Sequence, residues 1–398
     1  MITSMEIDGF KSLRNFRIDF QKGLNILVGP NGSGKTNICQ ALGLISAFAE
    51  NQLFEYLLTT AGGAKGAFTY SCTNQNVDTQ PAINAQFTGR VNSLLKLDKD
   101  DGNVLPLKYK YSFTLKLDEG LNVTEECLQI RALHPSTKKY RKVLSLKRAD
   151  EGRLRFIRGD TSLIGPVALD QLKAKPTVLL RPPGGREDSI LQFASALFYH
   201  AHVVRNDLAR VKVYNIDPHL AKLPSDILEP LEIMPNGRRL ANAIYLLEKR
   251  NKETLQEINA FLQNICSQYR EVRSEIPEDR MSRSFSLLND RGIVCPAQSL
   301  SDGTIKMIAM LVSLLGRKHN FAIFEEPENY LHPWACTTFI DYVRGLFDDT
   351  TCVMTTHSET ILNSVSPSEI VVVENADGRT TSRRIARFRE IEKVIMRS

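Results

Sequence analysis

The sequence predicts an α/β fold whose central parallel sheet carries a ligand site at the carboxyl ends of its strands. Three segments indicate this arrangement, because each is a short apolar run that ends at polar residues. Residues 23–28 lead into a glycine-rich loop, residues 321–324 into two glutamates, and residues 351–356 into a histidine. Central parallel strands are apolar along their length, and ligands of such sheets bind beyond the carboxyl ends of the strands. We therefore expect the three polar groups to meet.

The composition is typical of a soluble globular protein, with 398 residues of which 24% are charged and 42% are hydrophobic. The N-terminus has no basic segment followed by an apolar run, and no stretch approaches the roughly 18 apolar residues of a membrane span. The seven cysteines have no C-x-x-C spacing, which argues against a zinc site or a disulfide framework. We expect a cytoplasmic protein in a reducing compartment.

The glycine-rich loop reads G-P-N-G-S-G-K-T-N and lies between a strand and a helix predicted over 36–49. Its glycines permit backbone angles that let successive N–H groups converge on an anion, and the helix adds its positive N-terminal end. Lys35 would reach the β- and γ-phosphates, and the Thr36 hydroxyl would bind Mg²⁺. We expect a nucleoside triphosphate to contact Gly29, Pro30, Asn31, Gly32, Ser33, Gly34, Lys35, Thr36 and Asn37.

The polar residues after the other two strands predict the hydrolytic part of the site. Glu325 is placed to hold Mg²⁺ through water, because Mg²⁺ keeps much of its hydration shell. Glu326 would polarise the attacking water as a general base. His357 would sense the γ-phosphate or fix that water. Taken alone, the glutamates also fit a surface position and the histidine a packing role; their place at the strand ends favours catalysis.

A second anion-binding element is predicted at the turn S-L-S-D-G, which precedes a helix starting near Thr304. An exposed serine at a helix N-terminus is suited to bind an anion. Because the chain already has a phosphate loop, Ser301 and Gly303 would reach the nucleotide of another subunit. The alternative is that Ser301 or Asp302 simply caps the helix.

The middle of the chain predicts an added antiparallel β-layer and a helical insert. Successive strands are expected between residues 82 and 158, separated by Asp- and Gly-containing turns. Residues 56–66 read as a loop, residues 181–186 as a boundary loop, and residues 190–197 and 239–267 as helices. The expected units are a nucleotide-binding lobe with the β-layer (1–175), a helical lobe (176–284), and a segment that completes the ATPase core (285–398).

The net charge of +6 hints at an acidic partner. Nine basic residues and only two acidic ones lie between Lys138 and Arg158. Such a stretch fits contact with a phosphate backbone, but a solvated hairpin edge protected by charge explains it slightly better. A second cluster, formed by Arg383, Arg384, Arg387 and Arg389, fits a solvated tail.

Together these motifs resemble the ABC-type ATPase heads of the RecF, SMC and OLD (overcoming lysogenisation defect) group. The motifs are F-K-S (10–12), G-P-N-G-S-G-K-T-N (29–37), L-S-D-G-T-I-K (300–306), E-E-P-E-N-Y-L-H-P (325–333) and T-T-H-S (355–358). Asp302 stands where transporters carry glycine, and Glu325 stands where most ABC ATPases have aspartate. These departures resemble the stand-alone OLD-like branch rather than a transporter subunit. Gln86 is one candidate among several for the family's Q-loop glutamine.

The resemblance implies a P-loop NTPase head of the ABC type with Mg²⁺-dependent ATP hydrolysis. It also implies a head-to-head homodimer, in which each ATP lies between one subunit's glycine loop and the other subunit's Ser301 turn; higher oligomers stay open. Such an interface is isologous, so both sites form together. We expect no TOPRIM nuclease domain after residue 358, and no long coiled coil between the glycine loop and the Ser301 turn.

On this resemblance we expect an ATPase that regulates or scaffolds a separate effector, a nuclease, in bacterial anti-phage defence. Septu-like, PARIS-like and retron-associated ATPases are the precedents, and the inference is by analogy. One alternative is a RecF-like repair or maintenance ATPase that clamps duplex DNA through Lys138–Arg158. Another is a scaffold that binds ATP with little turnover.

Overall fold

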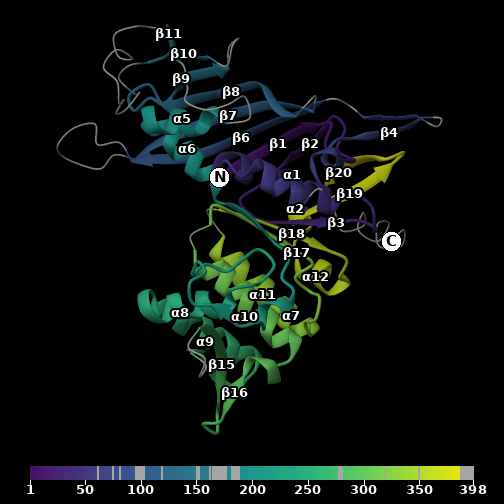
Figure 1. The fold of residues 1–398 in the computed structure, drawn as a ribbon, viewed down its shortest axis with the longest axis vertical. Coiled ribbons are helices and arrows are strands. Elements are labelled where there is room, and N and C mark those ends of the chain that lie inside the picture. Colours follow the sequence, from purple (N-terminus) through teal and green to yellow (C-terminus); the bar gives the residue numbers. More distant parts are fainter. Residues whose placement is uncertain are drawn as a thin grey trace, which may run out of the picture.

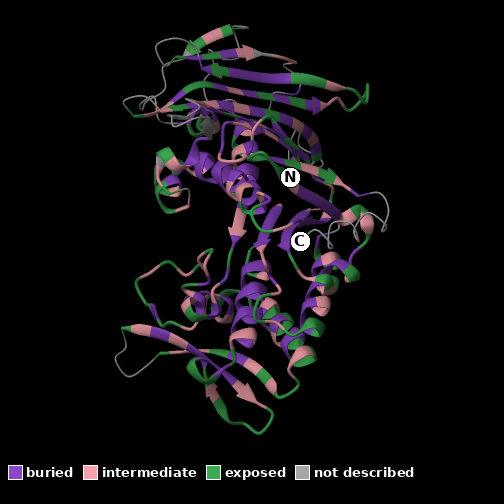
Figure 2. Cartoon of the chain, turned by 90° about the vertical axis from the view of Figure 1, so that its right-hand side faces the viewer, coloured by how far each residue is buried: buried purple, intermediate pink, exposed green. Residues whose placement is uncertain are grey.

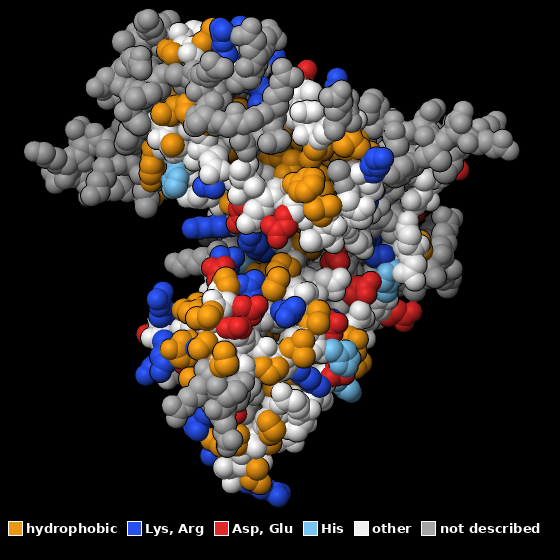
Figure 3. Space-filling model, viewed as in Figure 1, with side chains coloured by type: hydrophobic (Ala, Val, Ile, Leu, Met, Phe, Trp, Pro, Cys, Tyr) orange, Lys and Arg blue, Asp and Glu red, His pale blue; other side chains and the backbone are white. Residues whose placement is uncertain are grey.

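The computed structural model describes residues 1–60, 62–73, 76–79, 82–94, 104–117, 120–148, 153–160, 163, 177–180, 189–276, 281–317, 319–347 and 350–385. A large antiparallel sheet forms the upper half of the molecule, a parallel sheet crosses its middle, and a lobe of helices and short strands forms the lower half (Figure 1). On the face shown in Figure 3, several acidic side chains lie around the narrowing between the two halves.

The central sheet confirms the predicted parallel arrangement. Its strand order is β12-β17-β18-β3-β19-β20, and all neighbours are parallel except the last pair. The strands are β12 (Val211–Tyr214), β17 (Phe321–Glu325), β18 (Thr351–Thr356), β3 (Gly23–Val28), β19 (Ile370–Ala376) and β20 (Arg379–Arg384). Every residue of β18 is buried, as expected for a strand covered on both faces.

The antiparallel layer is larger than expected from the sequence, because it includes the strands that precede the glycine loop. The eight-stranded order is β11-β10-β9-β8-β7-β6-β1-β2. Its strands are β1 (Ile2–Asp8), β2 (Phe16–Asp19), β6 (Ala82–Leu94), β7 (Val104–Leu117), β8 (Leu121–Leu133), β9 (Tyr140–Arg148), β10 (Leu154–Arg158) and β11 (Thr177–Leu180). Along these strands buried and exposed residues alternate (Figure 2), so one face packs on the core and the other faces solvent.

Helix α1 (Lys35–Glu50) lies between the two sheets and belongs to the upper core. Helices α5 (Ile190–Leu197) and α6 (Tyr199–Ala209) complete this core, so the helix predicted at 190–197 packs under the large sheet and not in the lower lobe. Residues 56–66, expected to form a loop, contain most of α2 (Leu53–Thr60) and part of α3 (Ala64–Ala67). Helix α2 forms because Leu53 and Leu57 are buried against the core. A short hairpin pairs β4 (Tyr70–Thr73) with β5 (Asn76–Thr79).

The lower lobe packs on the other face of the central sheet. It contains α7 (Pro218–Ala221), α8 (Leu240–Arg250), α9 (Lys252–Ile265), α10 (Asp302–Leu315), α11 (Pro333–Leu346), α12 (Glu359–Ser364), β13 (Ser225–Asp226), β14 (Tyr269–Glu275), β15 (Ser282–Asn289) and β16 (Val294–Pro296). The single helix expected over 239–267 is two helices, because Asn251 caps α9 through the N–H of Thr254. The boundary loop expected at 181–186 lies outside the described residues.

One buried ion pair ties the large sheet to α5. The alternation of β8 breaks at Thr124 and Glu125, which are both exposed, and the resulting bulge turns Glu126 into the core. Its carboxylate is 3.0 Å from Arg148 Nη2 and also accepts hydrogen bonds from the Ser189 hydroxyl and the Ile190 N–H. The Arg148 side chain is 5% exposed and the Glu126 side chain is fully buried. Arg148 therefore has a structural role within the basic stretch predicted to contact a phosphate backbone.

Replacement of Arg148 by methionine should destabilise the fold strongly, because it leaves the Glu126 carboxylate buried without its cation. The expected loss is about 3–5 kcal/mol in the free energy of unfolding, measured by urea denaturation. Arg17→Met is the matched control, since Arg17 pairs with Glu6 on the surface, where the two side chains are 62% and 42% exposed; there the loss should stay below about 1 kcal/mol. Equal losses in the two variants would contradict this assignment.

Candidate nucleotide-binding site

The parallel register brings the three predicted strand ends to the same edge of the central sheet. Val28, the last residue of β3, pairs with Thr356, and Glu325, the last residue of β17, pairs with Thr355. The glycine loop, Glu326 and His357 therefore leave the sheet side by side. This juxtaposition is the one that the sequence predicts.

The glycine loop has the backbone geometry of a phosphate cradle. Gly32 and Gly34 have positive φ values of 77° and 104°, and Gly34 caps α1 with no side-chain hydrogen bond to the first-turn amides. A Cβ atom on Gly29 would lie 2.0 Å from the Val373 carbonyl oxygen, and one on Gly34 would lie 2.1 Å from Thr380 Oγ1. The loop is thus pressed against the β19–β20 hairpin, and only glycine fits at these positions.

Two polar groups of this loop fit a bound phosphate. The Ser33 hydroxyl oxygen is buried and has no hydrogen-bond partner among the described residues, and Lys35 Nζ donates to the carbonyl oxygens of Gly29 and Pro30 at 2.8 and 3.2 Å. Burial lowers the pKa of Lys35, while the nearby carboxylates of Glu326 and Glu328 favour its charged form. An anionic ligand would accept hydrogen bonds from both the Ser33 hydroxyl and the Lys35 ammonium.

Of the remaining loop residues, Thr36 is exposed at the start of α1, in reach of solvent and ligand. The side-chain amide of Asn37 donates to Ser12 Oγ at 2.7 Å. Ser12 in turn bonds to Thr380 Oγ1 at 2.7 Å. Asn37 therefore links the F-K-S segment to the glycine loop.

Glu325 is held from two sides at the end of β17. Asn215 Nδ2 donates to its Oε2 at 3.1 Å, and the buried Cys39 thiol of α1 bonds to the same carboxylate. Burial raises the pKa of Glu325 to about 7. Asn215 was missed in the sequence, although it obeys the same rule as the predicted residues, since it directly follows the strand β12 beside β17.

Glu326 faces His357 across the sheet edge. Its backbone has a positive φ of 45°, and its N–H donates to the carbonyl oxygen and the hydroxyl of Thr355 at 3.2 and 3.1 Å. Its Oε1 lies 3.9 Å from His357 Nε2, and its Oε2 accepts a hydrogen bond from Asn329 at 2.8 Å. Burial, followed by the charge of Lys35, lowers the pKa of His357, which favours the neutral imidazole.

Glu328 is a second residue that sequence reasoning missed. Its Oε1 accepts hydrogen bonds from the Thr356 hydroxyl at 2.6 Å and from the His357 N–H at 2.9 Å. Its Oε2 is buried without a hydrogen-bond partner among the described residues. Glu328 thus fixes the backbone on which His357 sits, and nothing in the local sequence distinguishes it from the neighbouring glutamates.

Ser301 and Gly303 lie in the lower lobe, at the start of α10. Ser301 caps α10, because its Oγ accepts the Thr304 N–H at 3.2 Å, so the capping alternative is realised while Ser301 itself remains exposed. Asp302 pairs with Lys222 at 2.7 Å. Next to Ser301 lies a groove of about 370 Å³, whose lining includes Gly303, Tyr330 and Trp334.

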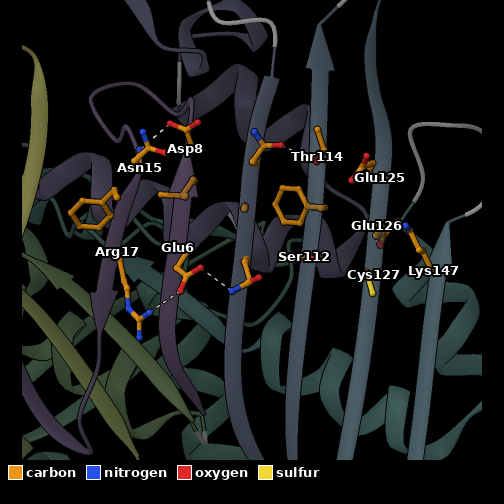
Figure 4. Close-up of a pocket in the computed structure, with 16 residues that line it drawn as sticks. Glu6, Asp8, Asn15, Arg17, Ser112, Thr114, Glu125, Glu126, Cys127 and Lys147 are labelled. Carbon is orange, nitrogen blue, oxygen red and sulfur yellow. Dashed lines mark hydrogen bonds and ion pairs between the residues drawn. The ribbon is translucent and has the colours of Figure 1, made fainter. Parts of the chain in front are cut away.

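Gln86, one candidate for the Q-loop glutamine, lies on the outer face of the large sheet. Its amide donates to Glu6 Oε2 at 2.9 Å. Figure 4 shows this region, a groove of about 490 Å³ in which Glu6 also pairs with Arg17. Asn215, in contrast to Gln86, contacts a carboxylate at the end of the central strand β17.

No helix in the part of the chain that the structure describes is long and apolar enough to cross a membrane. Among the same residues, no group of three or more histidine, cysteine or acidic side chains forms a metal site.

The fold is that of a P-loop ATPase head of the ABC type. A crystal structure of the Smc head bound to the C-winged helix domain of ScpA is similar over 98% of this chain and 99% of that chain, with a TM-score of 0.51 and 14% sequence identity. The chain belongs to the family described as "AAA domain, putative AbiEii toxin, Type IV TA system", whose sequence model matches residues 24–363.

Two curated relatives share short segments with the chain. The DNA replication and repair protein RecF of Heliobacterium modesticaldum is 42% identical over 45 residues, which are 11% of this chain and 12% of RecF. The Septu protein PtuA of Bacillus thuringiensis is 40% identical over 43 residues, which are 11% of each protein. The chain thus matches only a small part of the length of these relatives.

Substitution of Gly34 by alanine should weaken ATP binding at least tenfold, because the added methyl group meets Thr380 and the residue must keep a positive φ. Titration with a fluorescent ATP analogue measures the affinity. Gly23→Ala is the matched control: Gly23 also has a positive φ, of 79°, but no atom lies within 4 Å of its Cβ position, so its affinity should be unchanged. Equal affinities for wild type and Gly34→Ala would contradict the loop's role.

Proposed function

We propose that this chain is a Mg²⁺-dependent ATPase that dimerises head to head around two ATP molecules and regulates a separate effector, a nuclease, in anti-phage defence. The observation that carries the proposal is the meeting of Lys35, Glu326 and His357 at one sheet edge, while the exposed Ser301 lies at a separate helix N-terminus. One chain thus carries both a hydrolytic site and a separate turn that can bind an anion. This combination fits an active site in which the Ser301 turn of a second copy contacts the nucleotide.

In this proposal each residue at the sheet edge has its own task. Lys35 and the loop amides bind the β- and γ-phosphates, and Glu326 accepts the proton of the attacking water. Neutral His357 orients that water or contacts the γ-phosphate. Thr36 and Glu325 would hold Mg²⁺, which supplies charge neutralisation at the phosphates when bound. A single carboxylate beside a hydroxyl fits Mg²⁺, which uses few protein ligands.

The defence role rests on analogy. The short match to the Septu protein PtuA and the resemblance of the E-E-P-E-N-Y-L-H-P segment to stand-alone OLD-like ATPases favour it. The cytoplasmic location expected from the sequence fits this role. If ATP is bound but hardly hydrolysed, the chain is instead a nucleotide-dependent scaffold.

The variant Glu326→Gln should bind MgATP but hydrolyse it at least a hundredfold more slowly, because it lacks the base, and it should therefore accumulate the dimer. Light scattering after size exclusion is expected to show a doubled mass with MgATP and the monomer mass without it. Phosphate release measures turnover; a rate equal to wild type removes Glu326 from its role and favours the scaffold.

The dimer interface is tested by adding Ser301→Arg to Glu326→Gln. The long side chain should block the dimer while ATP affinity stays the same, because Ser301 caps α10 in the lower lobe and the chain's own glycine loop precedes α1. Gln256→Arg, exposed on α9, is the control and should leave the dimer intact. A dimer that forms equally well with Ser301→Arg would rule out this interface.

A second candidate function, the clamping of duplex DNA, is favoured by a row of like charges. Arg90 pairs with Lys108, Lys108 with Arg131, and Arg131 with Lys142, so four cations lie directly across four adjacent strands on the solvent face of the large sheet. Like charges opposite one another destabilise a sheet. At about 4.8 Å per strand the row spans roughly 14 Å, enough to contact several phosphates of a duplex.

This row changes the place of the proposed DNA contact, which the sequence put at Lys138–Arg158. Only Lys142 of that stretch belongs to the row. Lys142, Lys147 and Arg155 of that stretch point to the solvent face, and Arg155 pairs with Lys147. Strands β9 and β10 are paired on both sides, so protection of a free edge does not explain these charges. Of the C-terminal cluster, Arg387 and Arg389 lie outside the described residues.

The double variant Lys108→Glu, Arg131→Glu should lower the affinity for duplex DNA at least tenfold and reduce the slope of log K against log salt by about 2. Mobility shifts across a salt series measure both quantities. Lys116→Glu, on the same face of β7 but outside the row, is the control and should change little. Absence of salt-dependent binding by wild type would eliminate this candidate.

A further inference from the structure

A buried lysine connects the helix that starts at Ser301 with the hydrolytic glutamate. Lys306 lies in the second turn of α10, is 3% exposed, and is followed by a run of buried apolar residues. Taking an ammonium group out of water costs several kcal/mol unless polar partners compensate for it. The partners of Lys306 therefore show why the position holds a cation.

The ammonium is bound to the segment that follows β17. Lys306 Nζ donates to the backbone carbonyl oxygen of Glu326 at 2.8 Å, and it lies 5.7 Å from the centre of the Tyr330 ring. Burial lowers the pKa of Lys306 to about 8, while the carboxylates of Glu328 and Glu326 favour its charged form. The hydrogen bond joins the lower lobe to the sheet edge.

The backbone of Glu326 is held from both ends. Thr355 accepts its N–H, and Lys306 donates to its carbonyl oxygen. Its φ of 45° is unusual for a residue with a side chain, and such a conformation persists only where the surroundings impose it. The same carbonyl oxygen also accepts the Asn329 N–H at 3.3 Å, so loss of Lys306 removes the shorter of its two hydrogen bonds and weakens the restraint on the Glu326 backbone.

Helix α10 touches the same segment at a second point. A Cβ atom on Gly303 would lie 2.5 Å from the Tyr330 carbonyl oxygen, so the first turn of α10 packs directly on the backbone that follows Glu326. Any movement of this turn acts on Tyr330 and, through Lys306, on Glu326.

We propose that Lys306 is a positioning residue that couples the Ser301 turn to Glu326 of the same subunit, so that seating of this turn on a second copy's nucleotide aligns the hydrolytic carboxylate. The inference rests on the proposed ATPase dimer. It requires that loss of Lys306 slows hydrolysis within a dimer that still forms.

The test compares Lys306→Met with wild type and with Lys249→Met, an exposed lysine of α8. Methionine fills the same volume in an apolar helix. For Lys306→Met we expect kcat to fall at least tenfold, ATP affinity to change less than threefold, and MgATP to give the same dimer mass. In wild type the rate of ATP hydrolysis per subunit should rise with protein concentration as the dimer forms. In Lys306→Met this rate per subunit should stay constant. Lys249→Met should behave as wild type.

If Lys306→Met does not fold, Lys306→Gln replaces it. The glutamine amide is too short to reach the Glu326 carbonyl oxygen, so the same tenfold fall in kcat is expected. A kcat within twofold of wild type in the folded variant overturns the proposal. In a Glu326→Gln background, Lys306→Met should cause no further loss, because it acts through that residue. If Glu326→Gln alone keeps the wild-type rate, the proposed function fails; if only Lys306→Met keeps it, this inference alone fails.

Discussion

The alignment of parallel strand ends is the constraint on which the rest of the structure depends. Because β3, β17 and β18 run parallel and in register, the glycine loop, Glu326 and His357 leave the sheet at one level. A one-residue slip in any pair would move a polar group away from the others and turn buried side chains to the wrong face. The apolar cores on both faces of the sheet thereby fix the geometry of the site.

Long-range contacts then hold these strand ends in unusual conformations. Thr380 of the β19–β20 hairpin bonds to the carbonyl oxygen of Ser33 at 3.0 Å and braces the glycine loop. Glu328 ties the segment after β17 to the end of β18. Lys306 adds a contact from the lower lobe. Contacts from distant parts of the chain thus hold the strand ends, and one of these contacts comes from the helix that Ser301 caps.

The sequence predicts those elements that depend on residues adjacent in the chain. The glycine loop, the apolar strands and the cap at Ser301 each follow from residues adjacent in the chain. Glu328 and Lys306 could not be recognised in this way, because their roles come from neighbours 20 to 29 residues away. Asn215 does follow a strand as the predicted residues do, but its partner Glu325 lies 110 residues away. Arg148 shows the converse: its charge suggested a surface contact, but a bulge in the neighbouring strand supplies it with a buried carboxylate.

Mixing two inactive variants tests the central claim most directly. Lys35→Ala lacks the phosphate contact but keeps the Ser301 turn, while Ser301→Arg lacks the turn but keeps the loop. If each site combines the loop of one subunit with the turn of the other, an equimolar mixture contains intact sites in mixed dimers. Phosphate release should then rise above the summed rates of the two variants, with a quarter of the wild-type rate as the upper limit, since at most half of the dimers are mixed and each has one intact site. The broken second site weakens the mixed dimer and leaves the Ser301 turn of the hydrolysing subunit unseated, which keeps the rate below that limit. A mixture as inactive as its components would contradict a composite site.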